Sequence, residues 1–247
     1  MLTRISEIIQ ALQPIQEGEA FFEFWPSLET NAVKRKVFHD IECHLADVDE
    51  EQWKSLLPRV VEKFRTKVNY RGWQQAYDAL HEGIAFSFLK RDGFGDIEFL
   101  PVHQTQKTPD LKARRGQRSI RIEVKSINPS KDEVQARQNG TPRCTGQPLT
   151  EEFFSKLQKT LAHASEQLAA RQCDEKVIFV FLEFDDLLNE YVENDLRQIK
   201  VWLKTHKMFA DKYYIHSQPG YYFTSPQSDP PNLIVWPPDH DGVVARH

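Results

Sequence analysis

The sequence predicts an α/β protein in which helices flank a mixed central sheet, preceded by a mainly helical N-terminal region. Between residues 119 and 126, apolar residues at even positions alternate with charged residues at odd positions, as in a strand with one face in the core. Residues 176–184 form a continuous apolar run, as in a strand buried on both faces. The helical pattern between these segments predicts a crossover, which would make the two strands parallel.

Residues 1–68 form the first predicted region, and its pattern is mostly helical. Apolar residues recur at helical spacing from the start of the chain until Pro14 intervenes. A further helix is expected over residues 50–65, with Asp49 as its N-cap. Pro58 falls inside this span and can kink or split that helix. The region carries no signature of a functional site.

Residues 32–48 fit two structures, because their apolar positions match both helical and strand spacing, and we predict a helix. His39, Cys43 and His44 lie in this segment and are of types that bind metals. Without a second cluster of such residues, roles in packing and on the surface are the better interpretation.

Residues 69–247 are expected to hold the sheet and an aromatic, proline-rich C-terminal extension. A strong helical pattern covers residues 73–90. The polar stretch at 128–148 is long for a loop inside a compact domain, which is typical of a functional or disordered segment. The other predicted elements are strands at 96–101, 108–113 and 119–127, a helix capped by Thr150, a strand at 176–184, a helix at 191–205, and short edge strands at 213–215, 221–224 and 233–236.

Asp110, Glu123 and Lys125 have the side chains that a cation-dependent phosphodiesterase site needs. Glu123 and Lys125 lie two residues apart on a predicted strand, so they point to the same side of the sheet. Asp110 and Glu123 would hold Mg²⁺ or Mn²⁺, with a water of the cation as nucleophile. Lys125 would orient that water or offset the charge that builds on the phosphate. Taken singly, Asp110 fits a turn and Lys125 a surface position equally well; their combination favours the site.

The segment from Lys107 to Lys125 is strongly basic, although the whole chain has a net charge of −4. Seven basic residues against Asp110 and Glu123 give it a local charge of +5. A basic surface beside the carboxylates suits a phosphate-rich ligand, although the same residues also suit a solvated hairpin tip. The residues predicted to bind nucleic acid here are Lys112, Arg114, Arg115 and Arg118.

Residues 77–182 resemble the core of the PD-(D/E)xK nucleases, a superfamily with the restriction-endonuclease-like fold. The resemblance lies in the Pro-Asp pair at 109–110, the Glu-Val-Lys triplet at 123–125, and the helices before and after them. It implies cleavage of nucleic acid that leaves 5′-phosphate ends. Many enzymes of this fold act as homodimers, and the resemblance therefore allows a homodimer.

The resemblance also implies further site residues. An upstream helix supplies a glutamate in this superfamily, and Glu82 fits that position, with Asp78 and Asp96 as rivals. The Val124 carbonyl is the implied third metal ligand.

Side chains of the downstream helix face the substrate in many members of the superfamily. Lys156, Lys159 and Gln167 are the candidates here, although a polar helix face is also compatible with simple solvation. Lys131, in the polar stretch, is another expected nucleic-acid contact.

The predicted function is a metal-dependent deoxyribonuclease, an endonuclease that acts on DNA rather than RNA. The alternatives are an inactive nuclease-fold module that binds or scaffolds nucleic acid, and a nuclease for RNA or branched structures. A hydrophobic content of 40%, three scattered cysteines and no apolar run near the ~18 residues of a membrane span predict a cytoplasmic protein without membrane contact.

Overall fold

The computed structural model describes residues 2–12, 32–65, 74–101, 108–128, 148–169, 172–184, 192–219 and 233–237. The chain divides into two compact units, Met1–Phe99 and Leu100–His247. The division falls beyond residue 68, because the helix and strand that precede residue 100 pack with the N-terminal helices. The chain is an α/β protein with a mixed sheet flanked by helices and a helical N-terminal region, as the sequence predicts.

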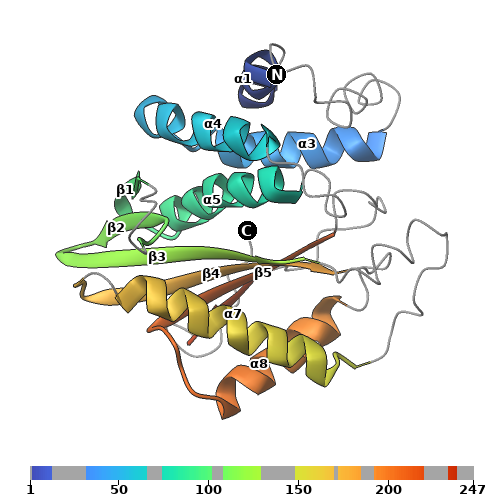
Figure 1. Cartoon of the computed structure of the whole chain (residues 1–247), viewed down its shortest axis with the longest axis vertical. Coiled ribbons are helices and arrows are strands. Elements are labelled where there is room, and N and C mark those ends of the chain that lie inside the picture. Colours follow the sequence, from blue (N-terminus) through green and yellow to red (C-terminus); the bar gives the residue numbers. More distant parts are fainter. Residues whose placement is uncertain are drawn as a thin grey trace. The chain divides into compact units, whose positions relative to one another are not determined.

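The first unit consists of four described helices and one short strand (Figure 1). These are α1 (Thr3–Leu12), α3 (Ala32–Leu45), α4 (Glu50–Arg65), α5 (Gln74–Arg91) and β1 (Gly95–Phe99). The segment that fits both helical and strand spacing is therefore a helix. Pro58 lies inside α4 without splitting it, and Asp49 caps this helix by accepting a hydrogen bond from Gln52 N–H at 2.9 Å.

Helix α5 packs closely against α3 and α4 at Gly83. A Cβ atom at this position would lie 2.7 Å from Leu45 and 2.8 Å from Leu56, both of which are fully buried. Only a residue without a side chain permits this approach, so we expect substitution of Gly83 to force the helices apart.

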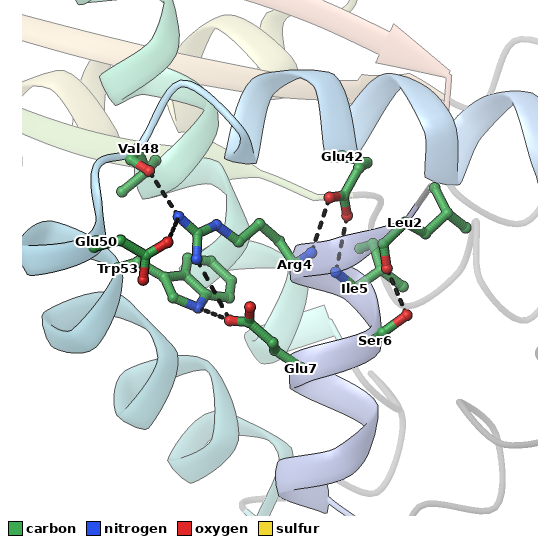
Figure 2. Close-up of polar contacts among 9 residues, drawn as sticks. All are labelled: Leu2, Arg4, Ile5, Ser6, Glu7, Glu42, Val48, Glu50 and Trp53. Carbon is green, nitrogen blue, oxygen red and sulfur yellow. Dashed lines mark hydrogen bonds and ion pairs between the residues drawn. The ribbon is translucent and has the colours of Figure 1, made fainter.

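Glu42 of α3 fastens α1 to the rest of the first unit (Figure 2). Its Oε1 accepts a hydrogen bond from Arg4 N–H at 2.8 Å, and its Oε2 accepts one from Ile5 N–H at 2.9 Å. The carboxylate thus satisfies two N–H groups that the first turn of a helix leaves unpaired, at the positive end of the helix dipole. The Arg4 side chain reaches α4, where it contacts Glu50 at 2.7 Å and lies over the Trp53 ring.

The second unit is built on a sheet of strand order β2-β3-β4-β5-β6. Its strands are β2 (Leu111–Arg115), β3 (Arg118–Ile127), β4 (Glu175–Phe184), β5 (Lys212–Pro219) and β6 (Leu233–Trp236). Strand β4 pairs in parallel with β3 and with β5, whereas the outer pairs β2–β3 and β5–β6 are antiparallel. The predicted parallel crossover is confirmed.

One predicted strand needs correction, and another lies outside the described residues. The segment at 213–215 belongs to β5, which lies between β4 and β6 instead of at an edge, because its buried tyrosines pack in the core. Residues 221–224, expected to form a short strand, lie outside the described part.

Helices α7 (Glu151–Ala169) and α8 (Val192–Thr205) cover one face of this sheet (Figure 1). Their apolar stripes pack with Ile127 of β3, with Ile178, Val180 and Leu182 of β4, and with Ile215 of β5. Thr150 caps α7 as predicted, because its hydroxyl accepts a hydrogen bond from Phe153 N–H at 3.2 Å. In the described part of the chain, no helix combines the length and the apolar character needed to cross a lipid bilayer.

Candidate active site

Strand register places Glu123 and Lys125 on the face of the sheet that α7 and α8 cover. Glu123 pairs with Ile178 and Lys125 with Val180, and both of these β4 residues belong to the core under the two helices. Residues paired across neighbouring strands point to the same face. The two candidate residues therefore lie side by side on the helix-covered face.

Asp110 lies directly before β2, so the expectation that it lies within a strand is wrong. Strand β2 begins at Leu111, because Pro109 has no N–H with which to extend the ladder. Asp110 is nevertheless firmly held. Its N–H donates to Ile122 O at 3.1 Å, and its carboxylate Oδ2 accepts from Val124 N–H at 2.8 Å. This second bond aims the carboxylate at the β3 backbone next to Glu123.

Glu123 is a fully buried carboxylate with one unsatisfied oxygen. Its exposed fraction is 0%, whereas the sequence pattern predicts a charged residue on an open face. The difference arises because α7 packs on β3 and covers that face. Lys125 Nζ donates a hydrogen bond to Oε1, but Oε2 has no hydrogen-bond partner among the described residues.

The surroundings of Glu123 strongly favour its protonated form. Burial, followed by the negative charge of Asp110 and a hydrogen bond to Asp110 that the protonated form makes, raises the pKa of Glu123 from 4.5 to about 8, and Lys125 opposes this rise. Two carboxylates close together without a cation repel each other, and a proton on one of them relieves this repulsion. A divalent cation would relieve it in the same way.

The donor set around this carboxylate pair fits a hard divalent cation. Asp110 and Glu123 supply carboxylate oxygens, the ligands that Mg²⁺ and Mn²⁺ prefer. The N–H and C=O of a strand residue point to the same edge, so the Val124 carbonyl faces the edge at which Asp110 lies. No cluster of three or more His, Cys, Asp or Glu side chains with metal-binding geometry occurs within the described residues. The cation would thus have two carboxylates and one carbonyl from this unit.

The basic residues of the β2–β3 hairpin divide between the two faces of the sheet. Lys112 pairs with Arg121 and Arg114 with Ser119, so they lie on the same face as Glu123. The pair Arg115 and Arg118 lies on the opposite face. Between the two strands, Gly116 has a φ of 63°, the conformation that a tight hairpin turn with glycine at its first central position requires.

Arg121 also lies on the face of the carboxylate pair, and sequence reasoning missed it. The alternation that puts Glu123 and Lys125 on one face puts Arg121 there too, so the signal was present in the pattern. Its guanidinium Nε and Nη1 are buried and have no hydrogen-bond partner in the described part of the protein.

The three candidates on α7 differ in position. Lys156 donates from Nζ to Asn128 O at 2.6 Å, which places it beside the end of β3. Gln167 lies three helical turns further along the same flank, half-buried, and its Oε1 has no partner within the described segments. Lys159 is exposed and lies one helical turn from Lys156. Lys131 lies outside the described residues.

Glu82 and its rivals Asp78 and Asp96 all belong to the first unit. Glu82 is half-buried and forms an ion pair with Arg59, with Nη1 and Oε2 separated by 3.0 Å. Asp96 is exposed, with a φ of 48°. A role for Glu82 at the carboxylate pair of the second unit stays a prediction.

His39, Cys43 and His44 form no ligand cluster among the described residues: His39 and Cys43 are exposed, and His44 is half-buried. The Ser87 hydroxyl donates to Asp47 at 2.6 Å, so the His44 ring must donate from Nδ1 to Ser87 Oγ, at 2.9 Å. Burial lowers the pKa of His44 to about 4, and the Arg91 charge acts in the same direction. His44 is therefore neutral at pH 7.

No protein-family model matches the sequence, and comparisons with curated proteins and with solved structures find no match either. The functional assignment therefore depends on this chain's own residues and geometry.

Proposed function

We propose that this protein is a divalent-cation-dependent nuclease that hydrolyses phosphodiester bonds of DNA as an endonuclease. The observation that carries this proposal is the Asp110–Glu123 carboxylate pair, in which Oε2 of the buried Glu123 lacks a partner among the described residues and Lys125 binds the other oxygen. Burying a carboxylate in this way costs stability, and a site that binds a cation gives a reason for it.

Each residue of the pair has a distinct role in this proposal. Asp110 is oriented by Val124 N–H and would hold Mg²⁺ or Mn²⁺ together with Glu123. A bound cation would act as a Lewis acid on a phosphoryl oxygen and make a water a stronger nucleophile at neutral pH. The Lys125 ammonium, beside Glu123, would offset the negative charge that develops on the phosphate during in-line attack.

The basic residues on the same face support a polyanionic substrate. Lys112 and Arg114 lie on the carboxylate face of the hairpin, and Lys156 lies beside the end of β3. Such a surface attracts a phosphate backbone although the whole chain is acidic. The protein would act in the cytoplasm, either alone or as a homodimer that cuts both strands.

An inactive nuclease-fold module that binds nucleic acid is the second candidate. The observation that favours it is the full burial of Glu123, with Lys125 already bound to one of its oxygens. In such a module the Glu123–Lys125 pair would be structural, and the basic face alone would bind the ligand.

Nicking of supercoiled plasmid DNA separates the two candidates. With Mg²⁺ or Mn²⁺, the wild-type protein should convert the plasmid to open-circular and linear forms, and D110N and K125M should not. R197M, which removes an exposed arginine of α8, is the matched control and should cut like the wild type. Nuclease function is rejected if the wild type cuts neither DNA nor RNA, or if D110N and K125M cut as well as the wild type.

A further inference from the structure

We propose that Arg121 binds a backbone phosphate of the substrate strand next to the phosphodiester held at Asp110 and Glu123. This inference rests on the proposed function and adds a second phosphate position to it. The site would then favour a polynucleotide, which offers two consecutive phosphates, over an isolated diester.

The first observation is the bonding state of Arg121. Two of its three guanidinium nitrogens, Nε and Nη1, are buried, and neither has a hydrogen-bond partner within the described segments. Nearby carboxylates at this end of β3 have other partners. Asp174 accepts from Ser119 N–H at 2.7 Å, and Glu175 lies 4.0 Å from Arg118. Two buried donor nitrogens without acceptors are costly, and an anionic ligand would satisfy them.

The second observation is a row of three basic residues across the sheet. Lys112 of β2, Arg121 of β3 and Lys176 of β4 are register partners, so they lie abreast on one face. Neighbouring strands are about 4.8 Å apart, and like charges directly opposite each other repel. An anion over this row would remove the repulsion.

The third observation is the separation between this row and the carboxylate pair. Arg121 and Glu123 are alternate residues of β3 on the same face, which puts their Cα atoms about 6.6 Å apart. Successive phosphates along an extended strand are separated by a comparable distance. A strand with one phosphate at the carboxylate pair would therefore bring its neighbour to Arg121.

Gln167 belongs to α7, the helix that packs on the same face of the sheet as Arg121. Phe154 of α7 stacks on Trp202 of α8, so the opposite flank of α7, with Lys156 and Gln167, faces the β2–β3 edge. The helical rise carries the chain about 16 Å back along β3 between these two residues, towards Glu123 and Arg121. Gln167 thus lies on the flank that borders the proposed phosphate position, where its side-chain NH₂ could donate to a phosphate oxygen; Oε1 is an acceptor and could not.

A binding experiment with modified oligonucleotides tests this inference. A short single-stranded oligonucleotide is titrated in Ca²⁺ in place of Mg²⁺, a hard cation that takes the same oxygen ligands, with a check that no strand is cut, and one phosphate at a time is replaced by a neutral methylphosphonate. Wild-type protein should lose about tenfold in affinity when the phosphate at Arg121 is neutralised. R121M should show this loss with the unmodified strand and no further loss at that position. Its salt dependence of binding should also fall by about 0.7 in slope, the value for one contact with a single strand.

Two controls separate the inference from its competitors. R197M removes an exposed arginine of α8 and should leave the methylphosphonate profile unchanged. If Arg121 is structural and only balances the negative end of the α7 dipole, R121M should lower the melting temperature. We expect R121M to melt at or above the wild-type temperature, because methionine keeps the apolar stem and removes the unpaired charge; R121K provides a second variant if R121M does not fold.

The outcome of this experiment is independent of cleavage. If R121M binds with wild-type affinity and an identical methylphosphonate profile, or if the wild type binds no oligonucleotide, the inference is wrong. If the profile changes as expected but the plasmid is never cut, Arg121 binds phosphate in a non-catalytic module, and only the proposed function fails.

Discussion

Two buried glutamates, Glu42 in the first unit and Glu123 in the second, differ in how completely their carboxylate oxygens are bonded. Glu42 is 7% exposed, and each of its oxygens accepts a backbone N–H from the first turn of α1. Glu123 is 0% exposed, and only one of its oxygens is bonded, to Lys125. Burial alone therefore does not mark a functional acid. The oxygen without a donor among the described residues sets Glu123 apart, and it is the reason for proposing a cation site there.

The largest expected difference between the two glutamates is in catalysis. E123Q keeps the size of the side chain but removes the charge that would hold the cation, so plasmid cleavage should fall by about a thousandfold or more. E42Q should cleave at the wild-type rate, measured well below its melting temperature in single-turnover conditions. A cleavage rate of E123Q within about tenfold of the wild type would remove Glu123 from the site.

The effects on stability should be in the reverse order: substitution of Glu42 should lower the free energy of unfolding, and substitution of Glu123 should not. E42A leaves two N–H groups of α1 without acceptors, at about 1–3 kcal/mol each, so the free energy of unfolding should fall by about 2–6 kcal/mol. At pH 7 Glu123 is mostly protonated, because its pKa is raised to about 8, and glutamine closely resembles the protonated carboxyl, so E123Q should unfold at the same denaturant concentration as the wild type. Urea titrations at pH 7 without divalent cations measure both. A large destabilisation by E123Q would show that Glu123 is structural.

Elements with local signals could be predicted from the sequence. Asp49 and Thr150 were identifiable as N-caps because a capping oxygen acts on residues two or three positions away. Strand β4 was recognisable because a strand buried on both faces is apolar at successive positions, a pattern visible in its own sequence. These features depend only on residues that lie within a few positions of one another in the sequence.

Features set by register and packing could not be predicted. The burial of Glu123 depends on α7, which lies more than twenty-five residues further along the chain. The place of β5 inside the sheet depends on its pairing with β6 across residues 220–232. The alignment of Lys112 with Arg121 follows from the hairpin turn at Gly116, which fixes the register. The proximity of Glu123 and Lys125 was predicted, because both residues lie on one face of a single strand.

The response to pH should distinguish Glu123 from an acid with ordinary surroundings. Its pKa is raised to about 8, so a cation must displace a proton below that pH, and Mn²⁺ affinity should rise by about tenfold per pH unit up to pH 8 and then level off. In the absence of cations, the stability that protonated Glu123 contributes is fully present below pH 4.5 and lost as pH rises through 8. Calorimetric Mn²⁺ titrations and thermal melts from pH 6 to 9 measure these two effects. E123Q should show neither, and a wild-type protein whose affinity is flat over this range would contradict the raised pKa.

The smallest expected effect comes from substitution of Lys125, the group that opposes the rise in the pKa of Glu123. Its ammonium lowers the pKa of Glu123 by charge and by a hydrogen bond. K125M should therefore move the pH at which Mn²⁺ affinity levels off upward by about one unit, whereas K125R, which keeps the charge, should move it less. An unchanged midpoint in K125M would mean that Lys125 does not stabilise the Glu123 carboxylate. Lys125 would then be free to act on the substrate alone, and K125M would lose cleavage without any change in cation binding.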